Sequence, residues 1–97
     1  MPVQVIIKRK MKINAPEKLI PLLTNLRERA KEQQGYISGE TLRNIYKPSD
    51  YMVISTWETA DDWQRWFASQ ERRELQGEVD SLIGEKTFYE IYESVSS

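Results

Sequence analysis

The sequence predicts an α+β fold in which helices cover one face of an antiparallel β-sheet. Two observations support this prediction. Four segments resemble strands, either because apolar residues recur with a period of two or because aromatic and β-branched residues are frequent. Between them lie segments with apolar residues at helical spacing. The order is strand, helix, strand, strand, helix, strand, which is the βαββαβ order of ferredoxin-like domains. A chain of 97 residues has room for one such domain, spanning residues 1–97.

The first strand is expected at residues 3–13, where the odd-numbered residues form an apolar face that only Arg9 interrupts. A buried guanidinium needs an acid or an anionic ligand. Arg9 could therefore form a salt bridge to a glutamate such as Glu40 or Glu58, or it could stabilise an enolate or a carboxylate.

The first helix is expected to begin near Asn14 and Pro16, and Gly35 is expected to end it as the residue after the C-cap. Pro21 falls in the second turn and should bend the helix or delay its regular start. The apolar stripe of this helix contains Leu19, Leu22, Leu23, Leu26 and Ala30.

The second and third strands are expected at residues 36–46 and 51–57, and a turn at residues 47–50 joins them into a hairpin. Gly39 is a candidate for a bulge or for a close approach of another group. Trp57 stands at the end of the third strand.

After this strand the apolar period becomes helical. Thr59 is a good N-cap, and Trp63, Trp66 and Phe67 lie on one side of the helix that follows. The pattern then weakens, so a second, loosely held helical piece is expected at residues 70–82, with Leu75, Val79 and Leu82 as its apolar residues. Gly84 ends this piece, and residues 86–93 form the last strand.

The sequence contains no cysteine and no histidine. This composition excludes disulfides, thiolate or imidazole metal ligands, and catalysis by cysteine or histidine. Mg²⁺ or Ca²⁺ with oxygen ligands stays formally possible, but the sequence has no short cluster of carboxylates with suitable spacing, so we expect no metal and no cofactor. The formal net charge of -1 argues against a nucleic-acid partner. No membrane partner is expected either, and the short apolar run before the first positive charges is the reverse of a signal peptide, so a cytoplasmic location is expected.

The predicted sheet has more apolar surface than the helices can cover. The residues concerned are Tyr36, Ile37, Met52, Ile54, Phe88, Tyr89 and Tyr92. A second copy of the chain could cover the free face, which predicts a homodimer through the sheet face.

Several motifs resemble those of the antibiotic biosynthesis monooxygenase domain. They are Gly35-Tyr36 at the start of the second strand, TWET at residues 56–59 and DDWQRWFAS at residues 61–69. The resemblance extends from Val3 to Glu93. It implies the fold of the dimeric α+β barrel superfamily, and the family includes cofactor-free oxygenases of aromatic polyketides and quinols, haem-degrading enzymes and isomerases.

The tryptophan spacing is similar to that of the haem-degrading members, because Trp66 follows Trp57 by nine residues. Those enzymes use a histidine ten residues further on as the iron ligand, and Gln76 stands at that position here. Arg9 corresponds to their pocket asparagine. Haem degradation of that kind is therefore not expected.

The anthrone oxygenases of the family resemble this chain at Trp57. They have an asparagine four residues before this tryptophan, which polarises a carbonyl, and a tyrosine six residues after it, which assists proton removal. Val53 and Trp63 stand at those positions here. These differences argue against that particular mechanism and leave oxygenation in general open, because electron-rich quinols and anthrones react with O₂ once they are deprotonated and held in an apolar pocket.

Two hypotheses for the function follow. The first is a monooxygenase that acts without a cofactor on a small aromatic or quinone-like molecule, and the second is a non-catalytic dimeric domain that binds a small ligand or serves assembly. Arg9, Trp57 and Trp66 are the candidate catalytic residues. The candidate substrate-binding residues are Arg9, Tyr36, Asn44, Val53, Trp57, Trp63, Trp66, Gln76 and Tyr89. The tryptophans could instead be core residues, and the tyrosines and Asn44 could instead belong to the interface or the sheet.

Overall fold

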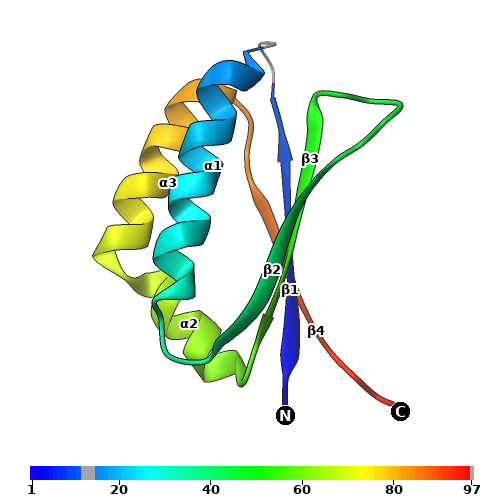
Figure 1. Ribbon diagram of the computed structural model, residues 1–97, viewed down its shortest axis with the longest axis vertical. Coiled ribbons are helices and arrows are strands. Elements are labelled where there is room, and N and C mark those ends of the chain that lie inside the picture. Colours follow the sequence, from blue (N-terminus) through cyan, green and yellow to red (C-terminus); the bar gives the residue numbers. More distant parts are fainter. Residues whose placement is uncertain (12–14, 97) are drawn as a thin grey trace.

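The protein is an antiparallel sheet with its helices on one face (Figure 1). The computed structural model describes residues 1–11 and 15–96. Its elements are β1 (Val3–Lys10), α1 (Pro16–Lys31), β2 (Tyr36–Arg43), β3 (Asp50–Trp57), α2 (Ala60–Ala68), α3 (Gln70–Ile83) and β4 (Phe88–Glu93). The strand order is β2-β3-β1-β4. The predicted ferredoxin-like α+β fold is therefore confirmed, while the predicted strand residues 12–13 and the helix signal at Asn14 lie outside the described residues.

The alternation in β1 places its odd-numbered side chains under the helices. Val3, Val5 and Ile7 are buried there, and Arg9 is buried in the same row. Because β1 pairs with both β3 and β4, it is a central strand, and its inner face is the floor of the core.

Helix α1 buries Leu19, Leu23, Leu26 and Ala30, as its apolar spacing predicts, and it runs through Pro21 without a break. The expected role of Gly35 is wrong, because the helix already ends at Lys31.

Gly35 instead belongs to the turn before β2, where its φ is 88°. Its carbonyl accepts a hydrogen bond from the Glu58 backbone N–H at 2.7 Å. A Cβ at this position would overlap the Asp62 side chain, so the turn requires glycine for both its dihedral angle and its space.

Strands β2 and β3 form the predicted hairpin. β2 ends at Arg43, before the expected residue 46, because the Asn44 side-chain oxygen accepts hydrogen bonds from the backbone N–H groups of Tyr46 and Lys47 and turns the chain. Of the two expectations for Gly39, the close approach is confirmed, since a Cβ there would overlap the Tyr36 hydroxyl. The irregularity of the pairing lies earlier, between Tyr36 and Ser38.

Helix α2 begins at the predicted N-cap. The Thr59 hydroxyl oxygen accepts a hydrogen bond from the Asp62 backbone N–H at 3.0 Å, and this hydroxyl donates to the Asp62 carboxylate at 2.9 Å. The cap fixes the start of the helix, so Trp63 and Trp66 both face inward and are 3% and 5% exposed.

Helix α3 confirms the expected second helical piece and lies beside α1 (Figure 1). Its buried residues are Arg72, Gln76, Val79 and Ile83. The expected apolar residues Leu75 and Leu82 are only partly buried. Val79 and Ile83 are fully enclosed, so the helix is better anchored than its sequence pattern indicates. Gly84 ends it with a φ of 67°.

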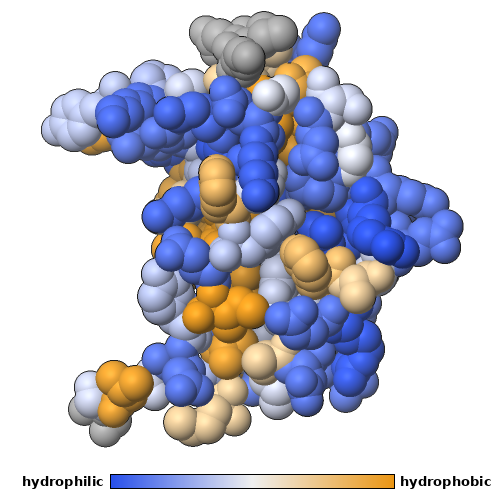
Figure 2. Space-filling model, turned by 180° about the vertical axis from the view of Figure 1, so that it is seen from behind, coloured by the Kyte–Doolittle hydropathy of each residue, from blue (hydrophilic) through white to orange (hydrophobic). Residues whose placement is uncertain are grey.

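The outer face of the sheet carries apolar side chains that no helix of this chain covers. Register and exposure place Ile6, Leu42, Met52, Ile54, Phe88 and Tyr92 on it. Two residues expected to add to this surface, Tyr36 and Tyr89, instead point toward the helices, because they pair with Trp57 and Ile7 of the inner face. Seen from behind, the sheet side of the molecule is hollowed, and hydrophobic surface gathers there (Figure 2).

The helices of the described residues are too short or too polar to cross a membrane. The longest of them, α1, has 16 residues, and a spanning helix needs about 20 apolar residues.

Candidate functional site

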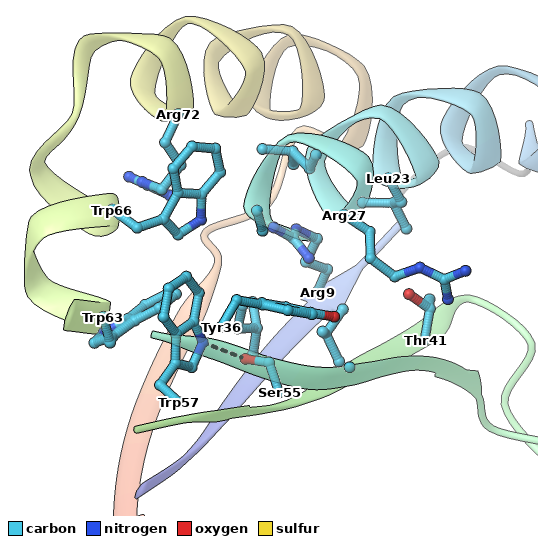
Figure 3. A pocket seen from close by; sticks show the side chains of 15 residues that line it. Arg9, Leu23, Arg27, Tyr36, Thr41, Ser55, Trp57, Trp63, Trp66 and Arg72 are labelled. Atoms are coloured by element: carbon cyan, nitrogen blue, oxygen red, sulfur yellow. Dashed lines mark hydrogen bonds between the residues drawn. The ribbon is translucent and has the colours of Figure 1, made fainter. Parts of the chain in front are cut away.

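A cavity lies between the inner face of the sheet and the helices (Figure 3). Its enclosed volume is about 50 Å³, or about 520 Å³ when its open mouth and the gaps between its lining atoms are included. Its lining consists of Ile7, Arg9, Leu23, Leu26, Arg27, Ala30, Tyr36, Gly39, Thr41, Val53, Ser55, Trp57, Trp63, Trp66 and Arg72. The lining is thus mostly apolar and aromatic, with a few polar groups, as is usual for small-molecule sites.

All three tryptophans of the chain line this cavity. Trp57 at the end of β3 is fully buried, and its indole N–H donates a hydrogen bond to the Ser55 hydroxyl at 3.1 Å (Figure 3). Its ring meets Tyr36 edge to face at 5.4 Å between centroids and Trp63 at 5.7 Å. Trp66 comes from α2, so strand and helix supply different walls of the cavity (Figure 3). These contacts hold the aromatic walls in fixed orientations.

Arg9 enters the cavity from the floor of the sheet and is 6% exposed. One terminal nitrogen, Nη2, donates a hydrogen bond to the Gln76 side-chain oxygen at 2.8 Å. The Gln76 amide nitrogen in turn donates to the Asp80 carboxylate at 2.8 Å and to the Thr87 hydroxyl at 3.1 Å. Asp80 is therefore hydrogen-bonded to Arg9 only through the neutral amide, although its charge also raises the pKa of Arg9 and so offsets a small part of the effect of burial.

Of the two alternatives for Arg9, the salt bridge to Glu40 or Glu58 is not formed. In the described part of the chain Arg9 forms no salt bridge. Glu40 is exposed because the even-numbered residues of β2 beyond its irregularity face away from the helices, and Glu58 is exposed just after β3. Burial lowers the pKa of Arg9; Tyr89 offsets part of this shift, and the nearby Arg72 adds to it. The guanidinium is therefore a buried cation that its surroundings compensate only in part.

Tyr36 lies on the β2 side of the cavity, with its ring against Trp57 (Figure 3). Its hydroxyl lies close to Gly39. The hydroxyl oxygen is buried and has no hydrogen-bond partner within the described residues. Burial raises the pKa of Tyr36, an effect that the charge of Arg27 partly opposes. At neutral pH the phenol is therefore protonated and can donate a hydrogen bond.

Two further arginines, Arg27 of α1 and Arg72 of α3, complete the polar lining. Arg72 is firmly held. Its Nε–H donates to the Phe67 carbonyl at 2.8 Å, one terminal nitrogen donates to the Tyr89 hydroxyl at 3.0 Å, and the guanidinium carbon lies 4.3 Å from the centre of the Phe67 ring. Arg27 is half-buried, and its Nε has no hydrogen-bond partner among the residues described.

The structure brings together six of the predicted substrate-binding residues. Arg9, Tyr36, Val53, Trp57, Trp63 and Trp66 all line the cavity.

The other three candidates lie outside this lining. Asn44 stabilises the hairpin turn and borders a separate groove of about 640 Å³. Tyr89 packs behind Trp63 and accepts the hydrogen bond from Arg72. Gln76 lies behind Arg9, and its amide is engaged in three hydrogen bonds. An amide held in this way does not fit the role of the haem-ligating histidine at the corresponding position.

Arg27, Ser55 and Arg72 line the cavity without having been expected there. Spacing could have indicated two of them. Arg27 follows Leu23 by four residues, in the phase of the apolar stripe of α1. Arg72 precedes Val79 by seven residues, so it shares the buried face of α3. A polar residue in phase with an apolar stripe is therefore the signal that could have identified both arginines.

Possible metal ligands do not gather anywhere in the described ranges 1–11 and 15–96. No group of three or more aspartates, glutamates, histidines or cysteines is close enough to hold an ion.

The fold is similar to several solved structures. SnoaB, a cofactor-independent oxygenase from Streptomyces nogalater, has a TM-score of 0.88 at 16% identity, with 99% of this chain and 95% of that chain covered. A putative antibiotic biosynthesis monooxygenase from Bordetella bronchiseptica has a TM-score of 0.85 at 18% identity, with 98% of each chain covered. Rv0793 from Mycobacterium tuberculosis has a TM-score of 0.86 at 13% identity, with 100% and 98% covered. At these identities the likeness shows the fold alone.

No curated protein sequence matches this chain. The sequence profile of the family described as antibiotic biosynthesis monooxygenase matches residues 2–78. This match covers most of the chain, including Arg9, Tyr36 and the three tryptophans of the cavity, and it agrees with the motifs at residues 56–59 and 61–69. The chain belongs to the antibiotic biosynthesis monooxygenase family.

Proposed function

We propose that this protein is a monooxygenase that oxidises a small aromatic or quinone-like molecule with O₂ and without a cofactor. The observation that carries the proposal is the convergence of Arg9 and all three tryptophans on one cavity. A flat aromatic ring packs well against indole walls, and a buried cation favours the anionic form of a substrate. The similarity to an oxygenase described as cofactor-independent supports this proposal.

The chemistry fits a substrate that itself supplies the electrons. For an anthrone-like CH₂ group, loss of a proton to solvent before binding gives a resonance-stabilised anion, and this anion reduces O₂. One oxygen atom enters the substrate, the CH₂ group becomes C=O, and the other oxygen atom leaves as water, so four electrons pass from the carbon to O₂. The protein contributes binding, orientation and stabilisation of the anion.

In this proposal each wall of the cavity has one task. Trp57, Trp63 and Trp66 hold the ring and exclude water. Arg9 stabilises the negative oxygen of the ionised substrate, and the Tyr36 hydroxyl donates a hydrogen bond to it. Anthrone oxygenases of the family have, at the positions of Val53 and Trp63, an asparagine that polarises a carbonyl and a tyrosine that assists proton removal. In our proposal Arg9 and Tyr36 take over the task of the asparagine, as donors to the substrate oxygen.

The cavity must widen before an aromatic molecule can enter. Its 50 Å³ exceeds the roughly 10–15 Å³ that a cavity needs to hold one water molecule but is far below the roughly 300 Å³ typical of a ligand pocket. Arg27 is only half-buried, and a long arginine side chain moves easily, so we assign the opening to the side of α1 that carries it.

The small enclosed volume also favours a second candidate function. A non-catalytic domain that binds a small ligand, or that serves assembly, needs no room for both a ring and O₂. We therefore keep a dimeric binding or assembly domain of the same fold as the alternative.

We also propose that two copies of the chain associate through the outer face of the sheet. Ile6, Leu42, Met52 and Ile54 follow one another across three strands of that face, and Phe88 and Tyr92 of β4 are 58% and 52% exposed. A partner sheet would remove this apolar surface from water.

Oxygen uptake tests the enzymatic proposal. The purified protein is incubated with a panel of hydroquinones and anthrones, and uptake is recorded with an oxygen electrode beside a protein-free control and the Arg9→Met variant. We expect uptake above the control for at least one compound and its loss in Arg9→Met. Uptake no faster than the protein-free control across the panel would refute the enzyme and, where binding is still measured, would favour the alternative.

A further inference from the structure

The cavity is cationic as well as aromatic. Its ionisable lining consists of Arg9, Arg27, Arg72 and Tyr36, and no aspartate or glutamate belongs to the lining within the described residues. The chain as a whole is nearly neutral, with a formal net charge of -1. The positive charge is therefore concentrated at this site rather than being a property of the whole surface.

Three buried polar atoms of this lining have no hydrogen-bond partner in the part of the chain that the structure describes. They are Arg9 Nε, Arg27 Nε and the Tyr36 hydroxyl oxygen. They come from β1, α1 and β2, and all three residues line the same cavity (Figure 3). More than about 90% of buried polar groups in proteins are paired, so three such atoms around one cavity call for a ligand.

All three groups act as donors. Arginine has no acceptor and stays charged even where burial lowers its pKa, as it does for Arg9. Burial raises the pKa of Tyr36, so its phenol keeps its proton at neutral pH. A ligand that satisfies these groups must supply acceptor atoms, and a negative charge would also compensate the buried guanidinium.

None of the side chains in this lining is a base at neutral pH, since the lining holds three arginines and a protonated phenol. A substrate that needs a proton removed inside the cavity would find no acceptor among these side chains. A ligand that arrives already ionised avoids this difficulty.

We propose that the cavity selects acidic aromatic ligands, which bind as anions with a carboxylate or phenolate oxygen on Arg9, Tyr36 and Arg27 and with the ring against the tryptophans. This inference rests on the proposed function and names its substrate class. It concerns binding alone, so it is tested without turnover.

The test compares two isosteric probes that differ in charge. Benzoate and benzamide are titrated into the protein under anaerobic conditions, and binding is followed by calorimetry. A nitrophenol is titrated in parallel, because its absorption spectrum reports whether the bound form is the phenol or the phenolate. We expect benzoate to bind roughly 10-fold or more tightly than benzamide, as charge-assisted hydrogen bonds require. We also expect bound nitrophenol to ionise at a lower pH than free nitrophenol.

Variants locate the effect. Arg27→Gln at the half-buried edge of the cavity is expected to weaken benzoate roughly 10-fold and to leave benzamide unchanged, and Tyr36→Phe should weaken benzoate several-fold. Arg73→Gln is the matched control, because Arg73 is the exposed neighbour of Arg72 and its loss changes the net charge equally.

Three results would overturn the inference. Benzamide could bind as tightly as benzoate, Arg73→Gln could weaken benzoate as much as Arg27→Gln does, or none of the anions could bind saturably. If the anions bind with the expected selectivity but no oxygen is consumed with any substrate, the inference stands and the monooxygenase proposal fails.

Discussion

The two buried arginines of the cavity should respond in opposite ways to the same substitution. Arg9 and Arg72 are 6% and 7% exposed, respectively. Arg9 has one hydrogen bond, to Gln76, and forms no salt bridge within the described residues. Arg72 has two hydrogen bonds and lies over the Phe67 ring. A buried residue whose role is ligand binding should lower the free energy of unfolding, whereas a buried residue whose role is structural should raise it.

For Arg9→Met we expect a more stable protein. Burying an ion costs several kcal/mol, and methionine fills a similar volume without that cost. Against this gain, the Gln76 oxygen loses its donor, which costs roughly 1–3 kcal/mol. The net gain in unfolding free energy is on the order of 1–3 kcal/mol. For a domain of 97 residues each 1 kcal/mol raises Tm by roughly 4–8 °C.

For Arg72→Met we expect a loss of roughly 2 kcal/mol. The Phe67 carbonyl and the Tyr89 hydroxyl lose a charged donor, and the cation–π contact disappears as well. Both variants are unfolded in urea at one fixed protein concentration, since association would shift the apparent stability. If Arg9→Met is less stable than the parent protein by about 1 kcal/mol or more, Arg9 holds the fold together and our assignment of it to a ligand is wrong.

Three further predictions concern other parts of the molecule. Gly35→Ala should destabilise the fold by roughly 1–3 kcal/mol, because residue 35 has a positive φ and a Cβ there would overlap Asp62. Gly77→Ala has open space at its Cβ and should stabilise the fold by roughly 0.5–1 kcal/mol in the same urea titration. Equal effects of the two substitutions would contradict the role that we give to the turn at Gly35. Burial raises the pKa of Tyr36 above its ordinary 10.0, so the unfolded chain releases this proton first as pH rises. The free energy of unfolding should therefore fall above about pH 10. Measured at several alkaline pH values, it should fall less steeply for Tyr36→Phe than for the parent protein. The same slope for both proteins would count against the burial of the Tyr36 hydroxyl. Ile54→Glu on the outer face should convert a dimer into a monomer, as measured by light scattering. Ile45→Glu is the control and should leave the dimer intact, because Ile45 lies in the hairpin turn and is 81% exposed. A monomeric parent protein would rule out the proposed association.

The elements were predictable because their apolar residues recur with the right period. The odd-numbered residues of β1 form one apolar face as expected, interrupted only by Arg9, and Thr59 caps α2 as expected. The aromatic part of the site was predictable for the same reason, since a strand that ends at Trp57 and a helix that carries Trp63 and Trp66 on one side must bring the indoles together.

The polar part of the site was harder to predict, because the buried stripe of α3 is half polar. A search for apolar spacing selects Leu75, Val79 and Leu82, whereas the buried face is Arg72, Gln76, Val79 and Ile83. Arg72 and Gln76 can be buried because they form hydrogen bonds to Tyr89, Asp80 and Thr87. Tyr89 and Thr87 lie outside α3, so these hydrogen bonds form only in the folded chain and cannot be predicted from the spacing within the helix.

Arg9 and Gln76 also show why a comparison of single positions underestimates a site. In the sequence the two residues are separate differences from the pattern of the haem-degrading members, at the positions of the asparagine and the histidine. In the structure the two differences are one interaction, because the Gln76 oxygen accepts the hydrogen bond from Arg9 Nη2 at 2.8 Å. Gln76 is itself fixed by Asp80 and Thr87, so it restrains the end of the guanidinium and leaves Nε beside the cavity without a partner. Together the two residues form a fixed cation, and a fixed cation in an aromatic cavity is chemistry suited to an anionic ring.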